Sequence, residues 1–138
     1  MPNIYVARSA SLQEWSADVG LTDHVYKVGV ADGGAEAAVT ALSAESFAGA
    51  TDWKLLKEEA VETVDMNGVA EKLARKEKAI DPTMYPRLKG AMHLFKVKMS
   101  NVQTRLLVNQ MMAGQEEKLT KKPKAADVAE YLIRTALD

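Results

Sequence analysis

A period-two alternation of apolar and polar residues predicts β-strands at several places along this chain of 138 residues. The expected strands cover residues 3–8, 24–30, 52–57 and 93–99. In the second of them, Val25, Lys27 and Gly29 fall on one face, whereas Tyr26 and Val28 fall on the other. These stretches are rich in β-branched and aromatic residues, which favours the strand interpretation.

Apolar residues spaced three and four apart predict four longer helices. Their expected ranges are 35–45, 68–79, 101–113 and 125–137. A shorter helix is expected over 11–19, where Ser11 and Glu14 form a capping box. Asn67 and Ser100 are the expected N-caps of the second and third longer helices.

The order of these elements predicts an α+β fold in a single domain, with a small, mainly antiparallel sheet of three or four strands flanked by helices. A chain of this length with 47% apolar residues can bury one core of its own. We expect residues 1–114 to form the main domain. Residues 115–138 are expected to add an exposed basic connection, up to residue 124, and an amphipathic helix that packs on the same domain.

The composition excludes several kinds of site. The chain has no cysteine, so disulfides, zinc thiolate sites, iron–sulfur clusters and thiol nucleophiles are excluded. Neither His24 nor His93 has a second ligand at metal-binding spacing, and no serine lies in a G-x-S-x-G elbow. No apolar run approaches the length of a membrane helix, and the first residues do not resemble a signal peptide. We therefore expect a cytoplasmic protein without membrane contact.

Charge is distributed unevenly along the chain, although the formal net charge is only −1. Residues 1–66 carry 4 Lys and Arg against 11 Asp and Glu, whereas residues 67–99 carry 8 against 3. The basic middle of the chain fits two interpretations, a local patch that faces an anionic partner or a solvated helix face. The acidic first half argues against a chain that wraps nucleic acid along its whole length.

Five short segments follow one another in an order that is similar to a known family. They are Asn3–Val6, Tyr26–Gly29, Asp52–Leu56, Ala70–Arg75 and His93–Val97. The first two resemble the G-I-Y and Y-K-[IV]-G strands of the GIY-YIG nuclease superfamily, in its phage-type and meiosis-associated branch. The fourth resembles the helix of that branch that bears a glutamate, and the fifth resembles its closing W-F-K-V segment. The resemblance spans residues 3–110.

The resemblance implies a phosphodiester-cleaving site and gives roles to particular residues. Tyr5 and Tyr26 correspond to the motif tyrosines, of which one acts on the attacking water or hydroxyl. Glu71 corresponds to the catalytic glutamate that holds one divalent metal, Mg²⁺ or Mn²⁺ in an active member. The family's arginine, which meets the phosphoryl charge, corresponds to Ala38 here, and loss of such a cation costs roughly 10²–10³ in rate. The resemblance therefore implies a degenerate member of the family.

The preferred function on these grounds is DNA binding with little or no cleavage, in a phage or mobile-element setting. The binding face is expected near the two motif tyrosines, the helix of the glutamate and the basic stretch 72–98. The residues expected to face phosphates are Lys72, Arg75, Arg87, Lys89, Lys96 and Lys98.

Other interpretations stay open at this point. In a slow metal-dependent endonuclease, Arg75 or Arg87 would take the place of the missing arginine in space. In a non-catalytic interaction module, the amphipathic C-terminal helix would dock on a second copy of the chain. The residues also fit plain structural roles, with Tyr5 and Tyr26 as strand aromatics. Glu71 would then be the ion-pair partner of Arg75 on the same helix.

Overall fold

The computed structural model describes residues 2–21, 24–80, 83, 85–88, 91–112 and 124–137. The strands in these ranges are β1 (Pro2–Ser9), β2 (Val25–Asp32), β3 (Trp53–Ala60), β4 (Lys78–Ala79) and β5 (Leu94–Lys96). The helices are α1 (Ala10–Asp18), α2 (Ala35–Ala44), α3 (Met66–Lys76), α4 (Met99–Met112) and α5 (Ala125–Leu137), with 3-10 helices η1 (Phe47–Gly49) and η2 (Pro86–Leu88). None of the helices in these ranges has the length and apolar content that a bilayer crossing needs.

The strands form one antiparallel sheet in the order β3-β1-β2-β5-β4. This confirms the predicted α+β fold, and within the described residues the sheet has five strands rather than three or four. The additional strand is β4, which falls in the range 68–79 predicted as helix. The helix ends earlier, at Lys76, because Glu77 adopts an extended conformation with φ −126° and ψ 160°. The next two residues then pair with β5.

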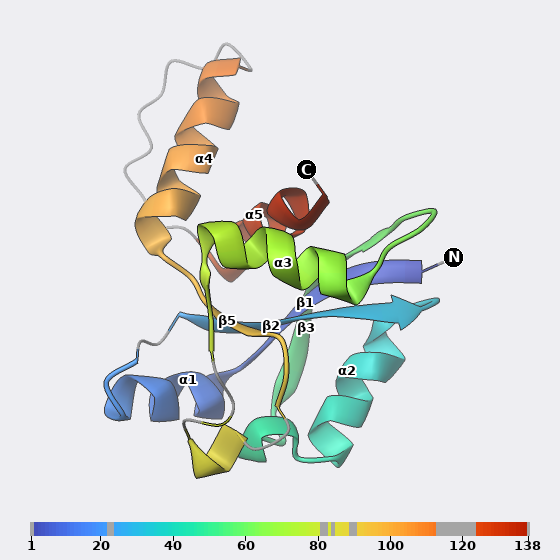
Figure 1. Ribbon diagram of the computed structural model, residues 1–138, viewed down its shortest axis with the longest axis vertical. Coiled ribbons are helices and arrows are strands. Elements are labelled where there is room, and N and C mark those ends of the chain that lie inside the picture. Colours follow the sequence, from blue (N-terminus) through green and yellow to red (C-terminus); the bar gives the residue numbers. More distant parts are fainter. Residues whose placement is uncertain are drawn as a thin grey trace.

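Helices cover both faces of the sheet (Figure 1). One face packs against α3, α4 and α5, and we call it the α5 face. The other packs against α1, α2 and the 3-10 helices, and we call it the α2 face. Strand β1 is buried from both sides, since Ile4 and Val6 lie in the core of the α5 face and Tyr5 and Ala7 in that of the α2 face.

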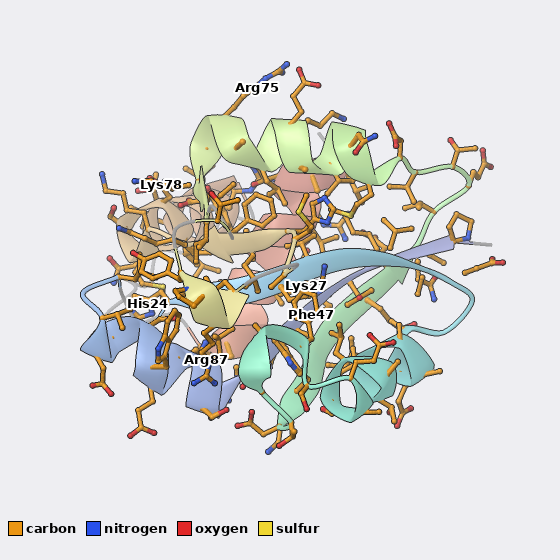
Figure 2. All side chains as sticks on the ribbon, turned by 60° about the horizontal axis from the view of Figure 1, so that its bottom comes forward. His24, Lys27, Phe47, Arg75, Lys78 and Arg87 are labelled. Carbon is orange, nitrogen blue, oxygen red and sulfur yellow. The ribbon has the colours of Figure 1, made fainter. Side chains whose placement is uncertain are left out.

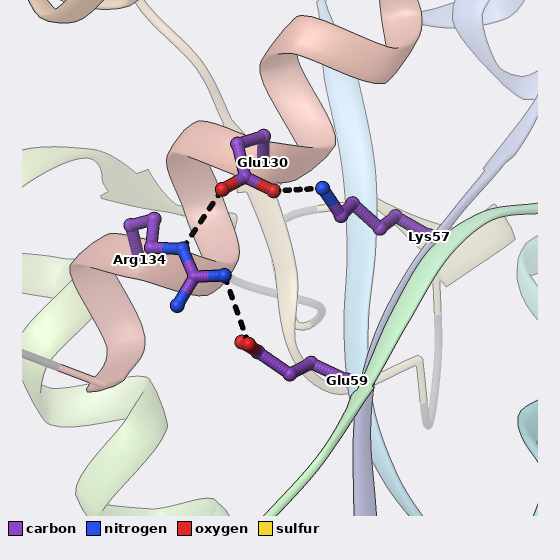
Figure 3. A network of polar contacts seen from close by, with 4 residues as sticks. All are labelled: Lys57, Glu59, Glu130 and Arg134. Atoms are coloured by element: carbon purple, nitrogen blue, oxygen red, sulfur yellow. Dashed lines mark hydrogen bonds and ion pairs between the residues drawn. The ribbon is translucent and has the colours of Figure 1, made fainter. Parts of the chain in front are cut away.

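Helix α5 packs its apolar residues against the sheet. The buried ones are Val128, Ala129, Tyr131, Leu132, Ile133 and Ala136. At the edge of this contact, Arg134 bonds both Glu59 of β3 and Glu130 at 2.8 Å (Figure 3). Lys57 of β3 also pairs with Glu130. The apolar stripe proposed for docking on a second copy is therefore covered by the chain's own sheet. Residues 115–123 of the expected basic connection lie outside the described ranges.

Helix α1 is capped by Ser9 and not by the predicted Ser11. The Ser9 hydroxyl accepts a hydrogen bond from the Leu12 amide at 3.1 Å, so the cap lies two residues before the predicted one and the helix begins one residue earlier, at Ala10. Ser11 lies inside the helix, where its amide and hydroxyl donate to the Asp52 carboxylate at 2.9 and 2.8 Å. The Ser9 hydroxyl donates to the same carboxylate. Asp52 thus ties the start of α1 to the edge of the sheet.

Helices α3 and α4 also begin earlier than predicted. Asp65 is the N-cap of α3, and its carboxylate accepts a hydrogen bond from the Asn67 amide at 3.2 Å. The predicted cap Asn67 is therefore inside the helix. Helix α4 begins one residue before the predicted cap Ser100. Its start is fixed by Glu77, whose carboxylate accepts a hydrogen bond from the Lys98 amide at 2.8 Å. This acceptor lies far from α4 in the sequence, so helix-capping patterns do not reveal it.

We predict that Asp52→Asn lowers the free energy of unfolding by about 1 kcal/mol at neutral pH, because the side chain that accepts the Ser11 amide in the first turn of α1 becomes a weaker acceptor. The hydrogen bond from Ser9, with those from Ser11, lowers the pKa of Asp52 from 3.8 to about 2. A carboxyl whose folded pKa is depressed stabilises the fold above its unfolded pKa and loses this effect as pH falls through the folded value. The difference between wild type and variant should therefore disappear between pH 3.8 and about 2. Urea unfolding over that range measures it.

The matched control is Glu14→Gln, an exposed position on α1, which should leave the free energy of unfolding nearly unchanged at every pH. A difference between wild type and Asp52→Asn that stays constant from neutral pH to about pH 2 would contradict the assignment.

Candidate functional site

The two motif tyrosines lie on opposite faces of the sheet. Tyr5 is in the core of the α2 face and is 5% exposed, whereas Tyr26 is in the core of the α5 face and is 4% exposed. The pairing of β1 with β2 requires this separation, because Tyr5 is opposite Gly29 and Tyr26 is three residues from Gly29 on the same strand. The structure does not bring the two hydroxyls together.

Tyr5 fills space that Gly29 leaves free. A Cβ added at Gly29 would lie 2.5 Å from Cζ of the Tyr5 ring, so only glycine permits the ring to lie across this strand. Burial also raises the pKa of the Tyr5 hydroxyl above its ordinary value. A phenol in this position is held by packing and is less ready to ionise than a free tyrosine.

Glu71 lies on the surface of α3, with its side chain 70% exposed, and bonds Arg75 at 3.1 Å. Ala38, at the position of the family's arginine, lies on α2 and packs against the core of the opposite face. The described part of the chain holds no group of three His, Asp or Glu side chains that could bind a metal together. The four positions of the nuclease motif are thus spread over two faces and do not surround one point.

The basic residues, by contrast, gather at two adjoining recesses. The first, which we call the helix recess, lies between α3, α4 and α5, has a volume of about 450 Å³ and is lined by Lys72, Arg75, Lys76 and Arg105. The second, which we call the strand recess, has a volume of about 550 Å³ and lies beside β4 and β5. Its cationic lining is Lys76, Lys78, Lys96 and Lys98. Lys76 lines both, so the two recesses form one positively charged surface.

Helical spacing explains the lining of the helix recess. Lys72, Arg75 and Lys76 are three and four residues apart on α3, which places them on one stripe of that helix. Thr104 and Arg105 lie on one stripe of α4 in the same way, with Asn101 and Val108 a turn before and after them. Tyr131 and Thr135 contribute the corresponding stripe of α5.

A buried carboxylate holds these helices together. Glu77 is 4% exposed, and its oxygens accept the Lys98 amide at 2.8 Å and the Asn101 amide group and Tyr131 hydroxyl at 2.9 Å. These donors, and the N-terminus of α4, replace the water that the carboxylate loses. Burial, and then the bond to Glu77, raises the pKa of Tyr131 to about 12. Tyr131 therefore stays protonated and remains a donor to Glu77.

Four of the six residues predicted to face phosphates line these recesses. They are Lys72, Arg75, Lys96 and Lys98. Lys89 lies outside the described residues. Lys76 and Lys78 belong to the basic stretch 72–98 but were not singled out, and Arg105 was missed because it lies beyond that stretch. Its only sequence signal is the helical spacing from Asn101 and Val108.

Arg87 has a structural role on the other side of the sheet. Its guanidinium donates to the carbonyl oxygens of Ala48 at 2.9 Å and Gly49 at 3.3 Å, and it lies 5.3 Å from the centre of the Trp15 ring. These contacts join η2 to η1 and α1. Figure 2 shows Arg87 and Arg75 on opposite sides of the molecule. Arg87 is thus not placed to substitute for the missing arginine beside Glu71.

Lys27 is a buried amine to which the sequence analysis assigned no function. It is 8% exposed, its Nζ donates to the Met92 carbonyl at 3.0 Å, and it lies 4.9 Å from the centre of the Phe47 ring (Figure 2). Burial lowers its pKa from 10.5 to about 8, because the charged form loses water. Burial, with a smaller effect of the Lys27 charge, also lowers the pKa of His93.

The residues brought together are therefore the cations of the two recesses, whereas the motif tyrosines, Glu71 and Ala38 are kept apart. Comparison with protein-family models, with curated proteins and with solved structures gave no match. The positively charged surface is the feature from which a function can be argued.

We predict that Glu77→Ala lowers the free energy of unfolding by about 2 to 4 kcal/mol, because one buried and two part-buried donors lose their acceptor. The matched change is Glu71→Ala on the same helix, which removes only an exposed ion pair and should cost about 0.3 kcal/mol. Urea unfolding of both variants measures the difference. Equal losses of the free energy of unfolding in the two variants would show that Glu77 does not hold α3, α4 and α5 together.

We predict that Lys27 makes the fold more stable as the pH rises from about 8 to 10.5. In that window the folded protein has lost the Lys27 proton whereas the unfolded chain still binds it, so raising the pH favours folding by at most about 1.4 kcal/mol per pH unit. Lys27→Met should lack this rise, and the exposed Lys54→Met should retain it. Urea unfolding at several pH values would contradict the prediction if Lys27→Met and wild type showed parallel curves.

Proposed function

We propose that this chain is a nucleic-acid-binding domain whose basic recesses hold the phosphates of DNA, with little or no cleavage. The observation that carries the proposal is the gathering of seven cationic side chains along the helix recess and the strand recess, with Lys76 common to both. Phosphate contacts from Lys and Arg supply most of the affinity of sequence-independent nucleic-acid binding.

The acidic side chains near this surface do not cancel its charge. Among the described residues that line the two recesses, Glu77 is acidic, and Glu71 pairs with the lining Arg75, so these seven cations stand against two carboxylates, a balance of +5. Glu77 is buried and already satisfied by neutral donors. A local excess of this size attracts a polyanion even though the whole chain has a net charge of −1.

The resemblance to the GIY-YIG superfamily agrees with the proposal in a limited way. After β1 and β2, the order α2, β3, α3 matches the β-β-α-β-α core that the resemblance implies, with α1 inserted between the first two strands. The opposite placement of Tyr5 and Tyr26, and the lack of a cation at Ala38, support binding without efficient cleavage. We further propose a cytoplasmic protein of a phage or mobile element.

We predict that fluorescently labelled DNA, single-stranded or duplex, binds in low salt and is released steeply as salt rises. Lys76→Gln should reduce the slope of log affinity against log salt by about 0.7 to 0.9, the value for one lost phosphate contact. Fluorescence anisotropy across a salt series, with magnesium present, measures both quantities.

The matched control is Lys54→Gln, which removes the same charge from β3, at the opposite edge of the sheet from β4. Its slope should equal that of the wild type. The proposal is wrong if neither DNA binds in low salt, if affinity is independent of salt, or if Lys54→Gln and Lys76→Gln behave alike.

A further inference from the structure

The helix recess is a half-open hollow in the surface. Helices α3, α4 and α5 wall it on three sides, and Figure 1 shows α4 projecting from the body of the molecule beside the end of α3. Its volume of about 450 Å³ is within the range of small-ligand sites. The paired bases of a duplex lie inside the double helix, so only an unpaired nucleotide can place its sugar and base in such a space.

The lining of the helix recess matches the parts of one nucleotide. Lys72, Arg75, Lys76 and Arg105 supply positive charge for a phosphate. Thr104 and Thr135 supply hydroxyl oxygens that can accept a hydrogen bond from a sugar or a base edge, since the Thr104 proton is already donated to the Ser100 carbonyl at 2.9 Å. Val108, which is 44% exposed, supplies apolar surface for a sugar or a base. A nucleotide combines an anionic end with an apolar, hydrogen-bonding body that fits a space of this size.

The walls of this recess are held in place before any ligand arrives. Asn101 of α4 and Tyr131 of α5 both donate to Glu77, at the end of α3, at 2.9 Å. This fixes the separation of the three helices, and a pocket that needs no rearrangement loses less free energy on binding.

We infer that the helix recess receives one unpaired nucleotide of a bound strand, while the neighbouring phosphates of that strand lie along the strand recess. The path between the two runs across Lys76, which lines both. The inference rests on the proposed nucleic-acid binding and adds a preference to it, namely single-stranded over duplex DNA.

The first test is competition against a labelled single-stranded oligonucleotide in low salt. Deoxyadenosine 5′-monophosphate should displace the oligonucleotide, and deoxyadenosine, which lacks the phosphate, should not do so at the same concentration. The single strand should bind about tenfold or more tightly than a duplex of the same sequence, because the duplex reaches the strand recess alone.

The second test uses two variants of α4 that change the charge equally. Thr104→Glu places a carboxylate in the helix recess and should weaken binding of the mononucleotide about tenfold or more. Gln103→Glu adds the same charge at the next position, which is exposed and does not line the recess, and should cost less than about threefold. Both sites are exposed on a helix, and circular dichroism and urea unfolding check that both variants fold.

The outcomes separate the two levels of the proposal. If oligonucleotides bind with the expected salt dependence but the mononucleotide fails to compete and the two α4 variants behave alike, the inference is wrong and the proposed function stands. If no DNA probe binds in low salt, the proposed function is wrong, and the inference falls with it.

Discussion

Strand β1 is hydrogen-bonded along both edges and buried on both faces, and the rest of the structure depends on this double burial. Ile4 and Val6 need an apolar layer on one side, and Tyr5 and Ala7 need one on the other. The chain supplies both layers, from α3, α4 and α5 on one face and from α1, α2 and the 3-10 helices on the other. The three-layer arrangement follows from the burial of this one strand.

The same constraint decides what the motif residues can do. Because side chains alternate along a strand, the register that places Tyr5 opposite Gly29 sends Tyr26 to the other face. Each tyrosine then becomes part of a core. The resemblance to the GIY-YIG superfamily stays a prediction, and the two tyrosines on which it draws serve packing. At the surface lie the cations on α3, on α4 and around β4 and β5.

Glu77 connects the fold to the proposed site. It ends α3, starts α4 and contacts α5, so one buried carboxylate sets the positions of the three helices that form the helix recess. A buried anion is costly unless several donors surround it, and the backbone, an amide and a phenol do so here. Glu77 also lines the strand recess beside Lys76, Lys78, Lys96 and Lys98. The carboxylate that holds the helices together thus lies next to the positively charged surface.

The sequence by itself determined the α+β class, four of the strands, the helices near their observed ranges and the basic stretch from which six of the seven recess cations come. Periodicity carries this information because it reports which face of an element is apolar. It does not report which element lies against that face. Only the tertiary structure decided that Glu77 is buried and extended, so that α3 ends before it and β4 follows. Only the tertiary structure also placed Arg105 of α4 beside the cations of α3. The opposite placement of Tyr5 and Tyr26 depended on strand register, which is fixed by contacts between segments far apart in the chain.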